Sequence, residues 1–168
     1  ATITGAIKAA QDKGFPPEEI WPYPADSERY STREPAGAAA AARPFRALKQ
    51  TEIRSYDAAL DWMQQGLGPI LLGIDWTNGL ANNRGEITLA DIRGGSLGGH
   101  CVFIWGWDAD GLLDLGNSHG PEWGENGWRK TRPEVVDTWT ARGDVYGLSD
   151  LESIDEPREV VPDIGEGM

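Results

Sequence analysis

His100 and Asn117 are of residue types that can cooperate in proton transfer. An amide oxygen can accept the proton of one imidazole nitrogen, which fixes the tautomer and leaves the other nitrogen free to take a proton from a thiol or a hydroxyl group. The plainer interpretation is that both are ordinary polar residues at the ends of strands. The chemistry therefore depends on whether the fold brings the two side chains together.

A β-hairpin is predicted between these two residues. Apolar runs at 101–107 and 112–115 flank the turn sequence DADG, which is the pattern of two paired strands joined by a tight turn. We interpret Asp108 and Asp110 as turn residues, because short acidic side chains accept hydrogen bonds from turn amides.

The register of this hairpin decides which side chains share a face. If Trp107 faces Leu112 across the turn, His100 lies opposite His119. Side chains alternate faces along a strand, so Asn117 then shares a face with both histidines and is a diagonal neighbour of His100. A slip of one residue would turn Asn117 to the other face.

The motifs around both residues resemble those of papain-like cysteine peptidases. NSHG from Asn117, followed by WGENGW from Trp123, resembles the family signature NSWG...WGENGY. GHCV from Gly99, followed by Gly106, resembles the HAV...VGYG strand of the family. A looser likeness covers residues 1–152, through KGFPPEEIWPYP near the start, the segment 56–75 and DVYGL near the end.

The resemblance implies a fold and a division of the chain. The fold class is α+β and papain-like, mainly the antiparallel β half-barrel domain, with an N-terminal helix and one or two further short helices. Residues 1–152 would form this C-terminal, histidine-bearing portion of a peptidase. Residues 153–168 are acidic, carry Pro and Gly, and are expected to form an extended tail.

The resemblance also implies residue roles. His100 would be the general base and Asn117 would orient it, while Gly99, Cys101, His119 and Trp123 would contact the peptide substrate. In the family, a tryptophan follows Asn-Ser and shields the histidine–asparagine hydrogen bond from water. Here that residue is His119, so the bond would be wetter or the pocket would be used differently.

The nucleophile of the family has no counterpart in these 168 residues. Cys101 adjoins His100 on a strand, so its sulfur points to the opposite face, and we interpret it as a small buried apolar residue that walls a side-chain pocket. The family cysteine lies upstream of the segment that Ala1 resembles. The resemblance therefore implies a partner, either a cysteine-bearing N-terminal segment or other protein subunits of an assembly.

Composition narrows the function classes. The chain has 168 residues, 39% of them hydrophobic, which suits one domain with a real core. Its formal charge is −12 without a Lys/Arg cluster, and no apolar run is long enough to span a membrane, so neither nucleic acid nor membrane is expected as a partner. The single cysteine excludes internal disulfides, which favours the cytoplasm or a virus particle over disulfide-forming secretion.

Cofactor chemistry is not expected. His100 and His119 could face each other as zinc ligands, but the sequence offers no convincing third or fourth ligand. The glycines at 94–99 do not follow a strand and open a helix, as a phosphate-binding loop requires. We therefore expect neither a metal nor another cofactor.

Three functions remain open at this point. The first is the histidine-bearing part of a papain-like cysteine peptidase, inactive as an isolated chain. The second is a non-catalytic papain-fold module with a structural or binding role, for instance in a phage particle. The third is transglutaminase-like or amidase chemistry, which no specific residue favours.

The other expected elements follow from apolar spacing and capping residues. We expect helices at 3–13 and 55–65, a helical turn at 132–140, and strands at 45–53, 69–76, 128–130 and 146–151. A loop is expected at 38–42 and a loop-rich crossover at 77–93. The first helix would be capped by Thr2 or Thr4 and would end at Gly14; the second would be capped by Ser55 or Asp57. The expected buried helix residues are Ala58, Ala59, Trp62, Met63, Val135, Val136 and Trp139.

Overall fold

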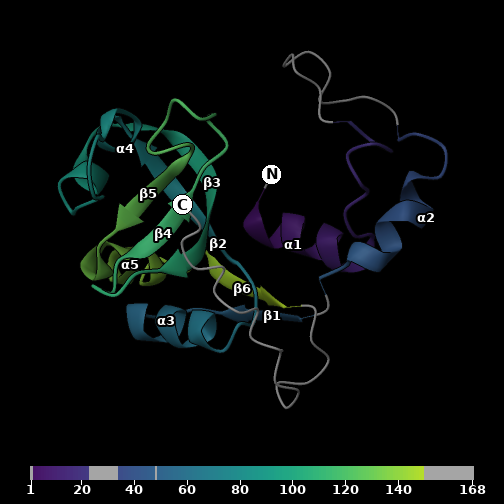
Figure 1. The fold of residues 1–168 in the computed structure, drawn as a ribbon, viewed down its shortest axis with the longest axis horizontal. Coiled ribbons are helices and arrows are strands. Elements are labelled where there is room, and N and C mark those ends of the chain that lie inside the picture. Colours follow the sequence, from purple (N-terminus) through teal and green to yellow (C-terminus); the bar gives the residue numbers. More distant parts are fainter. Residues whose placement is uncertain (1, 23–33, 48, 150–168) are drawn as a thin grey trace, which may run out of the picture.

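An antiparallel sheet of six strands, in the order β1-β6-β2-β3-β4-β5, forms the centre of the molecule (Figure 1). This computed structural model describes residues 2–22, 34–47 and 49–149, so the tail expected at 153–168 lies outside the described residues. The strands are β1 (Lys49–Glu52), β2 (Ile70–Thr77), β3 (Ser96–Trp107), β4 (Leu113–Gly116), β5 (Trp128–Thr131) and β6 (Val145–Ser149).

Short helices flank the sheet, which confirms the predicted α+β class. Figure 1 shows α1 and α2 on one side of the strands and α4 and α5 on the other. The helices are α1 (Ile3–Asp12), α2 (Ala38–Ala42), α3 (Tyr56–Gln64), α4 (Asn78–Asn82) and α5 (Pro133–Thr140), with 3-10 turns at Arg43–Phe45 and Asp91–Arg93. None of the helices in the described ranges is long and apolar enough to cross a membrane.

The core lies on one face of the sheet. Strand side chains alternate faces, so β2 buries Ile70, Leu72 and Ile74 while β3 buries Val102 and Ile104. Helices α3 and α5 cover this face with the residues predicted, except that Ala58 is exposed. The helix residues in the core are Ala59, Trp62, Met63, Val135, Val136 and Trp139.

The alanine run is a helix, and the prediction of a loop there was wrong. Gly37 begins it in the left-handed conformation, at φ 87°, and the chain continues past Ala42 into a 3-10 turn that accommodates Pro44. Alanine has the highest helix propensity, and a Cβ on Gly14 would lie 2.1 Å from the Ala42 carbonyl oxygen. Close packing of α2 on the end of α1 therefore stabilises the helix.

Capping residues fix the ends of two predicted helices. The Thr2 hydroxyl accepts a hydrogen bond from the Gly5 amide at 3.1 Å, and the Ser55 hydroxyl accepts one from Ala58 at 3.1 Å. Gly14, at φ 84°, follows the first helix as predicted. The segment 77–93, expected to be a loop-rich crossover, contains the short helix α4.

The β3–β4 hairpin forms with a different turn from the one predicted. Trp107 pairs with Leu113, not with Leu112, but the register shifts between Ile104 and Gly106, so that Phe103 pairs with Gly116. The expected alignment was therefore wrong at the turn and right beyond the shift. A β-bulge of this kind inserts one unpaired residue into a strand.

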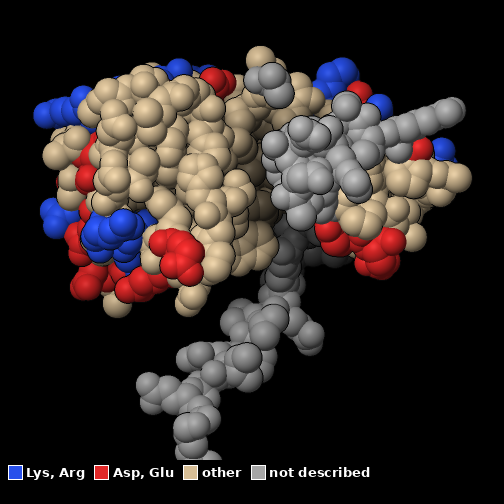
Figure 2. Space-filling view, turned by 90° about the horizontal axis from the view of Figure 1, so that it is seen from above, with Lys and Arg blue, Asp and Glu red and all other residues tan. Residues whose placement is uncertain are grey.

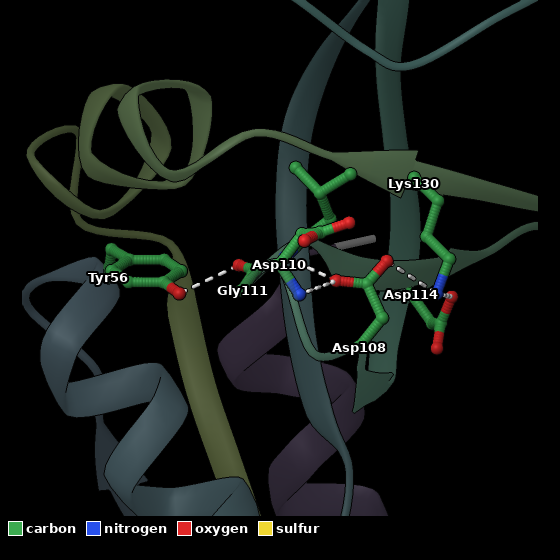
Figure 3. Close-up of polar contacts among 7 residues, drawn as sticks. Tyr56, Asp108, Asp110, Gly111, Asp114 and Lys130 are labelled. Carbon is green, nitrogen blue, oxygen red and sulfur yellow. Dashed lines mark hydrogen bonds and ion pairs between the residues drawn. The ribbon is translucent and has the colours of Figure 1, made fainter.

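Asp108 organises the turn itself, as predicted from its side-chain chemistry. Its carboxylate accepts hydrogen bonds from the backbone amides of Asp110 at 3.1 Å and Leu112 at 2.9 Å. It also pairs with Lys130 Nζ at 3.2 Å (Figure 3). These contacts include Leu112 in the turn, which explains why the ladder begins one residue later.

Charged residues do not gather into a basic patch on the face shown in Figure 2. Uncharged residues cover most of the larger body in this view, and its Lys and Arg side chains lie beside Asp and Glu side chains at the margins. This face offers no continuous positive surface for phosphate groups.

Candidate active site

The side chains of His100 and Asn117 lie in contact at the edge of the core. His100 lies on β3 opposite Ile74 of β2, and Asn117 directly follows β4. The distance from His100 Nε2 to Asn117 Oδ1 is 2.8 Å, which is a hydrogen bond. The hairpin therefore brings together the two side chains that the sequence placed on one face.

The orientation of the Asn117 amide follows from its other partners. Asn117 Oδ1 also accepts the Ser118 backbone N–H at 2.7 Å, and Asn117 Nδ2 lies 3.2 Å from His119 Nδ1. A backbone N–H can only donate, so the atom facing it must be the amide oxygen. His100 Nε2 therefore carries the proton that it donates to Asn117, and its Nδ1 is free to accept a proton.

Aromatic rings surround the His100 imidazole. His119 stacks on it at a centroid distance of 4.7 Å with 19° between planes, and Trp76 meets it edge-on at 4.8 Å. Trp76 also meets His119 edge-on at 5.1 Å. Two rings, those of Trp76 and His119, thus pack against the imidazole that bonds to Asn117.

Trp123 supports this cluster from the core. It is 6% exposed, lies 5.7 Å from Trp76 between ring centroids, and donates its Nε1–H to the Leu80 carbonyl oxygen at 3.2 Å. The buried indole of Trp123 therefore links Trp76 to α4. Gly99 directly precedes His100 on β3, and a Cβ built on Gly99 would have no atom within 4 Å.

Cys101 is not placed as a nucleophile for His100. It pairs with Gly73 of β2, and its Sγ lies 3.9 Å from the Val102 carbonyl oxygen. The residue is exposed, so the expectation that it is buried was wrong. Desolvation raises the pKa of its thiol, whereas a reactive cysteine needs a lowered one. It adjoins His100 on the strand, so the two side chains point to opposite faces.

The surroundings of His119 disfavour its charged form. Desolvation, followed by repulsion from His100, lowers the pKa of His119 below its ordinary value of 6.5. The stacked rings do not converge on a common point in the way that metal ligands do. Among residues 2–22, 34–47 and 49–149, no group of three or more His, Cys, Asp or Glu side chains could hold a metal ion.

A separate cavity of about 380 Å³ lies between α1 and α2, lined by residues that include Trp21, Ala42 and Arg43. None of the candidate site residues lines it. His100 and Asn117 therefore lie outside this cavity.

Comparisons with known proteins place this geometry in a fold. No protein-family model and no curated protein matches the chain. Xylellain, a cysteine protease from Xylella fastidiosa, matches with a TM-score of 0.74 at 22% identity, over 90% of this chain and 62% of xylellain. The chain has a papain-like fold. Procathepsin L 3 from Tenebrio molitor larval midgut has a TM-score of 0.63 at 21% identity, over 86% of this chain and 47% of its own.

Other neighbours with the papain-like fold are also cysteine proteases. The bromelain protease from Ananas comosus matches with a TM-score of 0.58 at 16% identity, over 86% of this chain and 66% of bromelain. The chain thus spans roughly half to two thirds of the length of these proteases. Similarity at these identities shows the papain-like fold and leaves activity to be argued from the site.

Trp76 is the site residue that the sequence analysis missed. It was read only as part of an apolar strand, yet it contacts both histidines and Trp123. The alternation of β2 carried a usable signal, since Trp76 continues the buried series of Ile70, Leu72 and Ile74 to the end of the strand.

Proposed function

We propose that this chain is the histidine- and asparagine-bearing part of a papain-like cysteine peptidase, which hydrolyses peptide bonds with a cysteine supplied from outside these 168 residues. The observation that supports this most directly is the 2.8 Å hydrogen bond from His100 Nε2 to Asn117 Oδ1, which leaves His100 Nδ1 free. The papain-like fold of the surrounding sheet adds to it.

The proposed reaction uses His100 as a proton shuttle. Its Nδ1 takes the proton of the supplied thiol, and the thiolate then attacks the peptide carbonyl carbon. The imidazolium returns the proton to the departing amine as the C–N bond breaks, which leaves an acyl-enzyme. Water deprotonated by the same nitrogen releases the acid and restores the thiol. Asn117 keeps Nδ1 directed at the sulfur throughout.

The peptide would lie along the exposed part of β3. Gly99 offers open space next to His100. Cys101 pairs with Gly73 of β2, and a Cβ built on Gly73 would lie 2.7 Å from Ile3 Cγ1 of α1. We propose that Gly99 and Cys101 contact substrate side chains there. His119 and Trp123 would contact the substrate on the His100 side of the strand, since His119 stacks on His100 and Trp123 packs against Trp76.

The partner in this proposal is the cysteine-bearing segment, and exposed aromatic side chains offer it a surface. Phe103 meets Trp128 edge-on at 5.3 Å, and Trp128 remains 37% exposed. Phe103 and Cys101 share the face of β3 opposite to the His100 side chain, so a segment packed on this aromatic pair would continue around the strand to bring its cysteine to His100. Burying such surface would stabilise the association.

The test is labelling of the supplied cysteine by a thiol-directed electrophile. The complete gene product is used with Cys101→Ser, so that the chain's own thiol contributes no signal. His100→Ala should abolish labelling at neutral pH, and Asn117→Ala should weaken it about ten-fold, because the base remains but is no longer oriented.

Two results would contradict the proposal. Undiminished labelling of His100→Ala would remove its assignment as the base. Peptide hydrolysis by the purified 168-residue chain would show that no external cysteine is needed. A complete gene product without any electrophile-reactive cysteine would instead favour a non-catalytic module.

A further inference from the structure

We propose that His119 is a positioning residue whose neutral Nδ1 holds the Asn117 amide in place for His100, and that protonation of His119 releases this amide. The catalytic consequence rests on the proposed peptidase function. The positioning itself is a property of this chain and can be tested without a nucleophile.

The hydrogen bonds assign the proton on His119. Asn117 Oδ1 accepts from both His100 and Ser118, so the amide has only its Nδ2 hydrogens to offer His119. An amide NH₂ group can only donate, so His119 Nδ1 must accept and His119 must carry its proton on Nε2. A relay of three side chains results, in which His100 donates to Asn117 and Asn117 donates to His119.

A protonated His119 would break this relay. Its Nδ1–H would face the Asn117 N–H at the present distance of 3.2 Å, where neither group can accept. It would also place a positive charge on a ring stacked 4.7 Å from the imidazole that must become positive when it accepts the thiol proton. Both effects oppose the active arrangement.

Within the described part of the chain, His119 meets side chains from β2, from β3 and from the segment after β4. Trp76 from β2 contributes an uncharged ring at 83°, Asn117 contributes an amide, and His100 from β3 is the titratable group that acts on it. Desolvation and repulsion from His100 lower the pKa of His119. His119 is nevertheless exposed as a residue, so protons from solvent reach it.

A tryptophan at this position could not do the same. An indole can cover the histidine–asparagine bond, but its nitrogen only donates and it does not titrate. The departure from the family motif at His119 therefore replaces an inert cover with an acceptor that is lost on acidification. As pH falls through the lowered pKa of His119, the relay opens.

Nuclear magnetic resonance can test this on the 168-residue chain, because the whole sequence contains only two histidines. At pH 7 we expect His119 to be protonated on Nε2 and unprotonated on Nδ1. In His100→Gln, the midpoint of the His119 titration should rise, because the repulsion from His100 that helps to lower the pKa of His119 is gone. Protonation of His119 on Nδ1 at pH 7, or an unchanged midpoint in His100→Gln, would overturn the proposal.

Two matched variants separate the acceptor from the ring. His119→Gln keeps an acceptor that does not titrate, and His119→Phe keeps a ring without an acceptor. In the complete gene product, we expect His119→Phe to slow cysteine labelling about five-fold at pH 7. We expect His119→Gln to restore the labelling rate at pH 7 and to keep it at acidic pH, where the labelling rate of the wild type falls. Equal rates and equal pH profiles for both variants and wild type would overturn the positioning role.

The two experiments also distinguish the two proposals. Unchanged cysteine labelling in both the His100 and the Asn117 variants would contradict the peptidase function. The tautomer and the titration of His119 would still report on the relay in that case. The expected tautomer with an inert cysteine would support the relay and contradict the peptidase.

Discussion

The indole of Trp76 meets the imidazole of His100 edge-on, with 4.8 Å between ring centroids and 64° between planes. The two residues come from neighbouring strands, β2 and β3, in which Trp76 pairs with Gly98 and His100 pairs with Ile74. The position of the imidazole therefore depends on the pairing of these strands as well as on Asn117. This links the stability of the sheet to the geometry of the site.

Replacing Trp76 should destabilise the fold and loosen the site. Trp76 is 6% exposed and contacts both histidines and Trp123, so Trp76→Ala should lower the free energy of unfolding by about 3–5 kcal/mol. Urea unfolding measures this change. Trp105→Ala is the matched control, because Trp105 is 59% exposed and should change stability by less than about 0.5 kcal/mol. Equal losses for both variants would contradict the role of Trp76.

The predicted contact between His100 and Asn117 formed because a β-bulge compensated for the one-residue error that was made at the turn. The predicted pairing of Trp107 with Leu112 was wrong by one residue, and the β-bulge before Gly106 restored the register. Nothing in the apolar pattern marks this bulge. Asp108 signalled a turn, but its bond to the Leu112 amide, which lengthens the turn, depends on the folded geometry.

The misread alanine helix and the overlooked Trp76 have a common cause. Gly37 and Pro44 are local signals that favour irregular chain, but packing of Ala42 against Gly14 outweighs them. Trp76 gained its role from contacts with residues far along the chain, including Trp123. Tertiary contacts of this kind have no signature within a short window of sequence.

Gly116 is required by the ring of Phe103. A Cβ at Gly116 would lie 2.4 Å from Phe103 Cζ, and the ring is held by Trp128, so Gly116→Ala should cost about 1–3 kcal/mol of stability. In a Phe103→Leu background the same change should cost at least about 1 kcal/mol less, which thermal unfolding in a double-mutant cycle measures. Gly85→Ala is the control, since nothing lies within 4 Å of a Cβ there. Strict additivity of Gly116→Ala and Phe103→Leu would argue against the clash.

Asp108 should make the stability of the hairpin depend on pH. Desolvation opposes its charge, but hydrogen bonds from Leu112 and Lys130 outweigh this and lower the pKa of Asp108 below its ordinary value of 3.8. A folded pKa below the unfolded one stabilises the fold above the unfolded value, and this stabilisation is lost as pH falls through the folded pKa. Asp108→Asn should therefore lower the melting temperature at pH 6, and the difference from wild type should shrink below about pH 4.

The control for this effect lies in the same turn. Asp110 contributes its backbone amide to Asp108, so Asp110→Asn removes one negative charge while leaving the carboxylate of Asp108 in place (Figure 3). Its melting temperature should follow wild type across the same pH range. If the difference in melting temperature between Asp108→Asn and wild type persisted unchanged to pH 2, the charge of Asp108 would not be its cause.

The hydroxyl of Thr77 should hold the end of β2 to α4 and to Asp91. This buried group accepts the Leu80 amide at 3.2 Å, which caps α4, and donates to the Asp91 carbonyl oxygen. Leu80 in turn accepts the hydrogen bond from Trp123, so Thr77 supports the indole that lies against Trp76. Thr77→Val keeps the shape of the side chain but leaves both backbone groups unpaired, which should cost about 1–3 kcal/mol in urea unfolding.

Thr77→Ser provides the matched comparison, because it keeps the hydroxyl and removes only a methyl group. Its loss should be smaller than that of Thr77→Val by about 1 kcal/mol, since an unpaired buried amide costs more than a lost methyl group at a strand end. Side-chain amide exchange of Asn117 and the indole N–H exchange of Trp123 should accelerate in Thr77→Val and stay near wild type in Thr77→Ser. A larger loss in Thr77→Ser than in Thr77→Val would mean that the methyl group, and not the hydroxyl, supports this corner of the site.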